Sequence, residues 1–152
     1  MPRLRIQLLG ALRVLRDEQP VPLPAKKAQA LLAFLALQPD RPHARARLAA
    51  LLWAEAGDSA ARASLRQALL VLRRALALGD DELCSDADTV MLRASAADTD
   101  TLEFERLSGD GSDVEALERA AALVRGELLE SFDARAEAFD EWLAVERQRL
   151  RG

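Results

Sequence analysis

Alanine and leucine dominate this chain of 152 residues, and this bias is its strongest structural constraint. They supply 59 of the 76 apolar residues, whereas only eight residues are Val or Ile. Alanine and leucine favour helices, and the β-branched residues that favour strands are too scarce for a large sheet. The sequence therefore predicts a mainly α-helical protein with little β-structure.

The net charge of −4 is unevenly distributed along the chain. Residues 1–95 carry 14 Lys/Arg and 10 Asp/Glu, a net charge of +4, whereas residues 96–152 carry 7 and 15, a net charge of −8. A modestly basic first part is compatible with a nucleic-acid partner, although the total charge is negative.

Several classes of protein are excluded by composition. One Cys and one His cannot make a disulfide or a Cys/His zinc site. No apolar run approaches the roughly 20 residues that span a bilayer, and the N-terminus does not resemble a signal peptide. We therefore expect a cytoplasmic protein with no membrane segment, metal or cofactor.

The first 24 residues have the pattern of a small antiparallel sheet. Residues 4–9 and 11–16 alternate apolar and polar side chains, which is typical of strands with one wet face. Residues 17–20 are predicted to form a turn. Residues 21–24 are predicted to form an edge strand, because two prolines remove hydrogen-bond donors from it.

Helical periodicity begins at Lys26 and stops before Pro39. A second, shorter helix is expected around residues 48–53. Beyond Ser95 the pattern is helical throughout, with helices predicted near residues 102–107, 114–124 and 136–150.

A long third helix is predicted from about Ser59 to Leu78. Asp58 or Ser59 is expected to cap its N-terminus, and Gly79 is expected to end it. Two short apolar segments then flank the turn-forming residues 86–88 and predict a β-hairpin of residues 83–85 and 90–92.

The two sides of the third helix differ sharply in chemistry. Spacing of 100° per residue places six apolar residues on one stripe: Ala61, Leu65, Ala68, Leu69, Leu72 and Leu76. The rest of the helix carries Arg62, Ser64, Arg66, Gln67, Arg73 and Arg74. No Asp or Glu occurs between Ser59 and Leu78, whereas a solvated helix usually mixes charges of both signs. This face suits phosphates and base edges, although a solvated surface would also carry arginines.

This order of a sheet, three helices and a hairpin resembles the OmpR/PhoB-type winged helix. Several sequence blocks are similar to SARP-type bacterial transcriptional regulators: residues 4–10, 26–32, 51–53, 63–69 and 72–76. Further blocks resemble the start of the helical, tetratricopeptide-like bacterial transcriptional activator domain: Asp100, residues 104–107, Ala121, Leu123, and residues 125–129 and 141–144.

The resemblance implies a winged-helix DNA-binding domain at 1–95 and the N-terminal part of a helical activator domain at 96–152. It also implies sequence-specific double-stranded DNA binding in transcription regulation, with the third helix in the major groove. RNA polymerase or another protein segment is the partner expected for the helical tail. The candidate DNA contacts are Arg62, Ser64, Arg66, Gln67, Arg73, Arg74, Lys26 and Lys27.

Two features leave an alternative open. Leu70 and Val71 lie beside the arginines, where they could meet thymine methyl groups, bind a protein, or mark weakened DNA binding. Asp86 and Asp88 at the hairpin tip would repel phosphate. The alternative is a protein-interaction module with weakened or lost DNA binding, whose arginines only solvate the surface. Arg45 and Arg47 of the second helix could add phosphate contacts or simply solvate a surface.

No arrangement of residues predicts an enzyme. His43 and Cys84 are expected to be structural, because neither has a partner for catalysis. Both tryptophans, at positions 53 and 142, have leucine neighbours and are expected to pack in the core. Neighbouring carboxylates lack a nucleophile or a glycine-rich loop beside them: Asp98 with Asp100, and Asp140 with Glu141.

Overall fold

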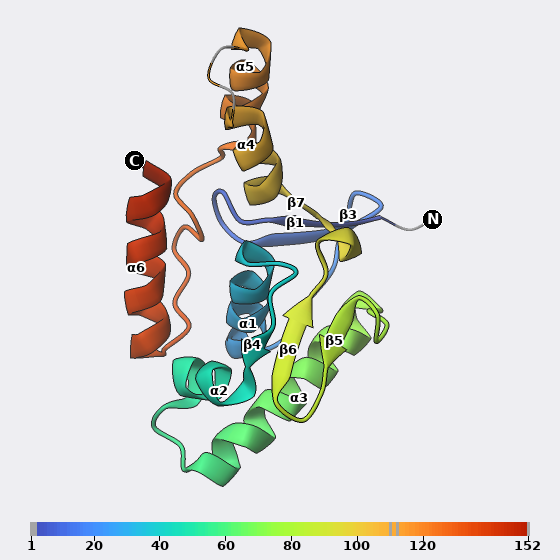
Figure 1. The fold of residues 1–152 in the computed structure, drawn as a ribbon, viewed down its shortest axis with the longest axis vertical. Helices are drawn as coiled ribbons and strands as arrows, with labels where there is room; N and C mark the ends of the chain where they lie inside the picture. The colour runs from blue at the N-terminus through green and yellow to red at the C-terminus, as the bar shows by residue number, and fades with distance from the viewer. Residues whose placement is uncertain (1–2, 110, 112, 152) are drawn as a thin grey trace. The chain divides into compact units, whose positions relative to one another are not determined.

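The computed structural model describes residues 3–109, 111 and 113–151, and within them the protein is mainly α-helical with two small sheets (Figure 1). Contacts divide the chain into two compact units. The sheet unit contains Met1–Pro20 and Ala97–Phe132, and the winged unit contains Val21–Ala96 and Asp133–Gly152. The predicted mainly α class with small β-structure is confirmed. Each unit combines chain from both parts of the sequence, and the domain assignment, 1–95 and 96–152, stays a prediction.

The sheet unit is built on four short strands in the order β3-β2-β1-β7. β1 (Leu4–Gln7) pairs antiparallel with β2 (Arg13–Arg16), which confirms the predicted strand pair. β7 (Asp98–Thr99) lies parallel to β1 and was not predicted, because two residues are too few to show a periodic pattern. Two helices complete the described part of this unit: α4 (Asp100–Ser108) and α5 (Val114–Leu123).

The edge strand predicted at residues 21–24 is wrong, and β3 lies earlier, at Gln19–Pro20. Asp17 and Glu18 adopt left-handed φ angles of 50° and 68°, which reverse the chain within two residues. Pairing with β2 therefore resumes at Gln19. Residues 21–25 form no strand, since the two prolines among them have no amide hydrogen to donate.

Asp98 on β7 and Asp100 at the start of α4 have structural roles in the sheet unit. Asp98 binds the guanidinium of Arg3, with an Nε to Oδ2 distance of 2.7 Å, and this hydrogen bond lowers the pKa of Asp98. The Asp100 carboxylate accepts hydrogen bonds from the amides of Leu8 at 2.8 Å and Leu9 at 2.9 Å. Burial nevertheless raises the pKa of Asp100. Both carboxylates are therefore held by contacts within the sheet unit.

The winged unit begins with three helices: α1 (Lys26–Leu37), α2 (Arg45–Trp53) and α3 (Asp58–Leu76). The predicted hairpin is confirmed as β5 (Leu83–Ser85) and β6 (Thr89–Leu92). β4 (His43–Ala44) pairs antiparallel with β6 and was not predicted, again because it has two residues. A short 3-10 helix, η1 (Ala94–Ala96), follows the hairpin.

The ends of α3 differ from those predicted. Gly57 occupies the N-cap position and Asp58 begins the helix, where its carboxylate lies at the positive end of the helix dipole. The helix ends at Leu76, because Ala77 adopts a left-handed conformation with φ 51° two residues before Gly79. This turn directs Leu78 into the core, where it is 8% exposed.

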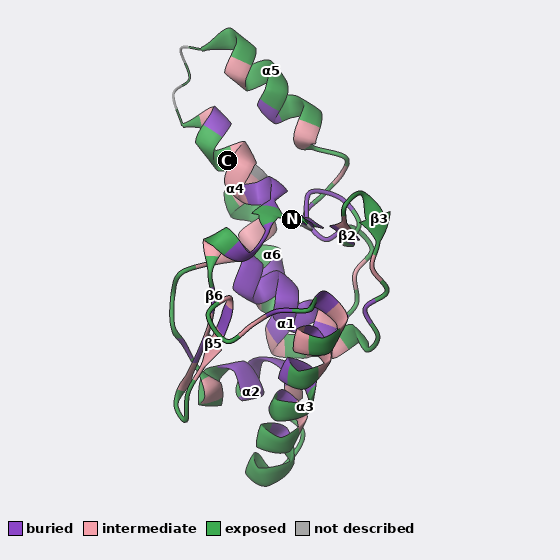
Figure 2. Ribbon diagram, turned by 90° about the vertical axis from the view of Figure 1, so that its right-hand side faces the viewer, coloured by how far each residue is buried: buried purple, intermediate pink, exposed green. Residues whose placement is uncertain are grey.

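α6 (Glu137–Arg151) supplies aromatic side chains to the core of the winged unit. The ring centroid of Trp142 lies 4.7 Å from that of Phe34 on α1 and 5.3 Å from that of Phe139. Phe34 and Phe139 are both completely buried. Figure 2 shows that α1 is buried over most of its length. A helix from the acidic tail of the chain therefore stabilises the helices that position α3.

Candidate nucleic-acid interface

α3 presents one buried and one exposed face, as its sequence predicts. Its buried residues are the six of the predicted stripe. Arg62, Arg66, Gln67, Leu70 and Arg74 are exposed, and the outer turns of α3 face solvent (Figure 2). α3 carries no carboxylate after Asp58. The exposed face is therefore cationic, with a single large apolar residue, Leu70, that is 39% exposed.

Arg73 does not lie with the exposed arginines. Its guanidinium donates hydrogen bonds to the backbone oxygen of Leu83 at 2.9 Å and to Oγ of Ser85 at 2.8 Å. Both acceptors belong to β5, so Arg73 connects α3 to the hairpin. The sequence could not distinguish this half-buried arginine from its exposed neighbour Arg74, because its two partners lie ten and twelve residues further along the chain.

Replacing Arg73 with alanine is expected to lower the stability of the winged unit by about 1–3 kcal/mol, since the acceptors on β5 lose a charged donor. Urea unfolding followed by tryptophan fluorescence measures this loss. Arg74→Ala is the matched control and is expected to change stability by less than about 0.5 kcal/mol, as exposed substitutions do. Equal stability of the two variants would contradict the role assigned to Arg73.

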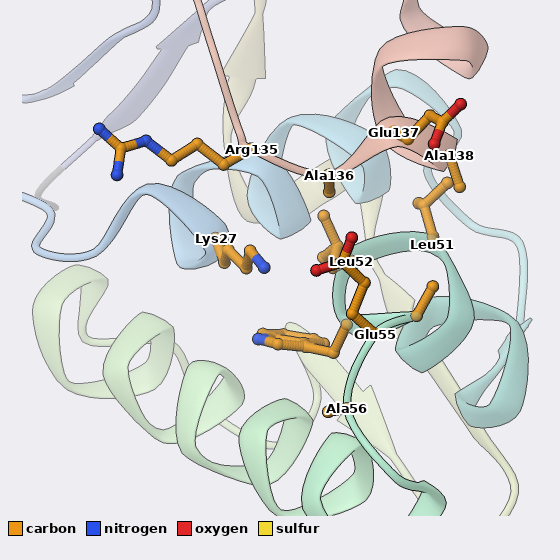
Figure 3. A pocket seen from close by; sticks show the side chains of 11 residues that line it. Lys27, Leu51, Leu52, Glu55, Ala56, Arg135, Ala136, Glu137 and Ala138 are labelled. Carbon is orange, nitrogen blue, oxygen red and sulfur yellow. The ribbon is translucent and has the colours of Figure 1, made fainter.

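Lys26, Lys27, Ser64 and Gln67 line one groove beside α3, together with Val71 and Trp53. This groove also contains Arg135, from the segment before α6. The sequence did not indicate this residue, because a loop position between Asp133 and Glu137 gives no periodic signal. A smaller pocket of about 160 Å³ lies next to the groove, between the end of α2 and the start of α6 (Figure 3). The structure thus brings the predicted residues of α1 to one side of α3.

The other side of α3 faces the hairpin tip, where charges of both signs occur. Arg62 lines a pocket with Arg45, Asp58 and Asp88. Arg45 Nε donates a hydrogen bond of 2.7 Å to the backbone oxygen of Asp86, so this arginine holds the tip. The amides of Asp88 and Thr89 donate to the Asp86 carboxylate and lower its pKa, which keeps the tip negative.

The structure also shows where His43, Arg47 and Cys84 lie. His43 is 6% exposed, its ring lies edge-on to Phe34, and burial lowers its pKa. The guanidinium of Arg47 lies 5.7 Å from the centroid of the Phe34 ring. Cys84 is a half-buried free cysteine on β5.

Among the residues that the structure describes, no three His, Cys, Asp or Glu side chains are arranged to hold a metal ion. No helix among these residues combines the length and the apolar character needed to cross a bilayer.

Comparison with known proteins identifies a shared fold. No family model and no curated protein matches the chain. Among solved structures, it is similar to EmbR of Mycobacterium tuberculosis, determined in complex with a low affinity phosphopeptide, with a TM-score of 0.83 and 24% sequence identity. The match covers 98% of this chain and 43% of the EmbR chain, so this chain spans less than half of EmbR. The chain therefore has the fold of the corresponding part of EmbR, which confirms the predicted fold of a SARP-type regulator.

Proposed function

We propose that this chain binds double-stranded DNA as a transcription regulator, with α3 lying in the major groove. The observation that carries the proposal is the exposed face of α3, where Arg66, Gln67 and Arg74 have no acidic neighbour on the helix after Asp58. The major groove, about 12 Å wide, admits an α-helix, and Arg and Gln can bind guanine and adenine through paired hydrogen bonds. The fold shared with EmbR is consistent with this role.

The proposed DNA contacts differ in their position on the helix. Arg66 and Gln67 are proposed to read base edges, because both are exposed and lie midway along the length of α3. The residues nearer its edges and ends are proposed to bind phosphates: Arg62, Ser64, Arg74, Lys26 and Lys27. Arg73 is proposed to position the hairpin wing, since its guanidinium binds β5.

The second part of the proposal concerns the helical tail. Residues 1–95 would form the DNA-binding domain, and residues 96–152 would begin a helical activator domain that contacts RNA polymerase or another protein. Exposed apolar side chains on α5 support a protein contact: Val114 is 67% exposed and Leu117 is 37% exposed. Because α6 contributes to the core of the winged unit, DNA binding is best tested with the full chain.

Selection of bound duplexes from random DNA tests the proposal and defines the site. Binding of a selected duplex is then measured by mobility shift at two salt concentrations in the presence of competitor DNA. The logarithm of the binding constant should fall with the logarithm of salt concentration by about 0.9 per phosphate neutralised. No shift even at low salt would refute DNA binding and favour the interaction module.

Arg66→Ala is expected to weaken binding to the selected duplex by about 1–3 kcal/mol, or roughly 5- to 150-fold, because a paired contact to a base is lost. The thermal midpoint should stay at the wild-type value, since Arg66 is exposed. Arg41→Ala, which removes an exposed arginine beyond the C-terminal end of α1, is the control and should bind as the wild type does. Equal binding by Arg66→Ala and wild type would remove Arg66 from the interface.

A further inference from the structure

The groove beside α3 differs from the opposite side of the helix in its charge. Three cationic residues line it, Lys26 and Lys27 at the start of α1 and Arg135 from the segment before α6, and its described lining contains no carboxylate. The pocket on the hairpin side is lined by two arginines, Arg45 and Arg62, and by two aspartates. Glu55 and Glu137 line the adjoining smaller pocket, which shares Lys27 and Arg135, but they do not line this groove. An anion lying in the groove along α3 therefore meets only cations among the charged residues of its lining.

Local structure fixes where Arg135 lies. Ala134 is 1% exposed and Phe139 is completely buried, so the segment is anchored on both sides of the arginine. The amide of Arg135 donates to Oδ1 of Asp133 at 2.8 Å, and the residue adopts a left-handed conformation with φ 55°. Its side chain is exposed and, in Figure 3, extends away from Glu137 and Glu55.

With α3 in the major groove, as proposed, this groove would face a DNA strand. A helix in the major groove has a phosphate backbone on each side, and the groove beside α3 is bordered by Ser64, Gln67 and Val71 along one edge of the exposed face. Cations at this position would lie next to one of the two strands. The hairpin tip, on the other side, carries Asp86 and Asp88, which repel phosphate.

We infer that Lys26, Lys27 and Arg135 form a binding site for the phosphate backbone of DNA, so that a residue following the predicted DNA-binding domain contributes to the interface. This inference rests on the proposed function. It assigns the backbone contact mainly to the α1 side of α3 and not to the tip of the wing. Because phosphate contacts carry no direct sequence information, Arg135 contributes affinity and its salt dependence rather than sequence preference.

The test compares Arg135→Gln with wild type in the full chain, using a selected duplex and a duplex of scrambled sequence. Arg135→Gln should bind both duplexes more weakly and by the same factor, and the slope of log K against log salt should become shallower by about 0.9. Between about 50 and 200 mM salt, the wild type should therefore lose about 3.5-fold more affinity than the variant loses. Arg135→Lys keeps the charge and should restore the wild-type slope.

Two controls make the result specific. Arg41→Gln removes an equal charge near the other end of α1, which is about 18 Å long, and should leave the slope unchanged. Unchanged thermal midpoints would show that the variants fold.

An unchanged slope for Arg135→Gln, with DNA binding by the wild type intact, would overturn this inference alone. No binding by the wild type would overturn it together with the proposed function. A loss of affinity confined to the selected duplex would also overturn it, because it would assign Arg135 to base recognition.

Discussion

Phe139→Ala is expected to destabilise the winged unit by about 3–5 kcal/mol, the usual cost of removing a buried aromatic ring. Phe139 is 0% exposed and lies 5.3 Å, between ring centroids, from Trp142, which in turn packs on Phe34. The substitution leaves a cavity between α6 and the core that supports α3. Losses of this size are comparable to the total stability of many small domains.

Urea unfolding monitored by tryptophan fluorescence measures the effect in the correct unit, because the two tryptophans, Trp53 and Trp142, both belong to the winged unit. Val145→Ala is the control on the same helix, since Val145 is 66% exposed, and it should change stability by less than about 0.5 kcal/mol. If Phe139→Ala unfolded at the same urea concentration as the wild type, α6 would not be part of this core.

Leu69→Ala and Leu70→Ala are expected to have opposite outcomes although the two leucines are adjacent. Leu69 is 3% exposed, and its truncation should cost about 2–5 kcal/mol. Leu70 is 39% exposed, and its truncation should change the free energy of unfolding by less than about 0.5 kcal/mol. Both substitutions remove the same atoms from the same helix, so the difference in stability reports the difference in burial.

This pair tests the orientation of α3, on which every proposed DNA contact depends. Thermal or urea unfolding of both variants is sufficient, and no DNA is needed. If Leu70→Ala were the more damaging substitution, the helix would be rotated by about 100°, the angle between consecutive residues. Arg62 and Arg66 would then lie on the buried side of the helix, and the interface would have to be assigned again.

The faces of α3 could be predicted from the sequence because they depend on local geometry. A helix of 3.6 residues per turn places residues three and four positions apart on one side, so the apolar stripe follows from spacing alone. The β5–β6 hairpin is local in the same way. The C-terminal end of α3 could be predicted less accurately. Ala77 takes a left-handed conformation, which the placement of Leu78 in the core favours.

The long-range contacts of the candidate site could not be predicted in this way. Arg73 and Arg74 are identical neighbours in sequence, but only Arg73 is close enough to β5 to bind Leu83 and Ser85. Arg135 gives no periodic signal, and its place beside Lys26 and Lys27 depends on the packing of α6.

The amino-acid sequence alone specifies the helical class, the buried stripe and cationic face of α3, and the hairpin that follows, because each depends on residue type and on spacing within one element. Tertiary packing makes α6 complete the core of the winged unit and makes Arg73 hold the hairpin. It also lines the groove beside α3 with three cations and no carboxylate. These features depend on contacts between residues far apart in the chain, which amphipathic periodicity within one element does not specify.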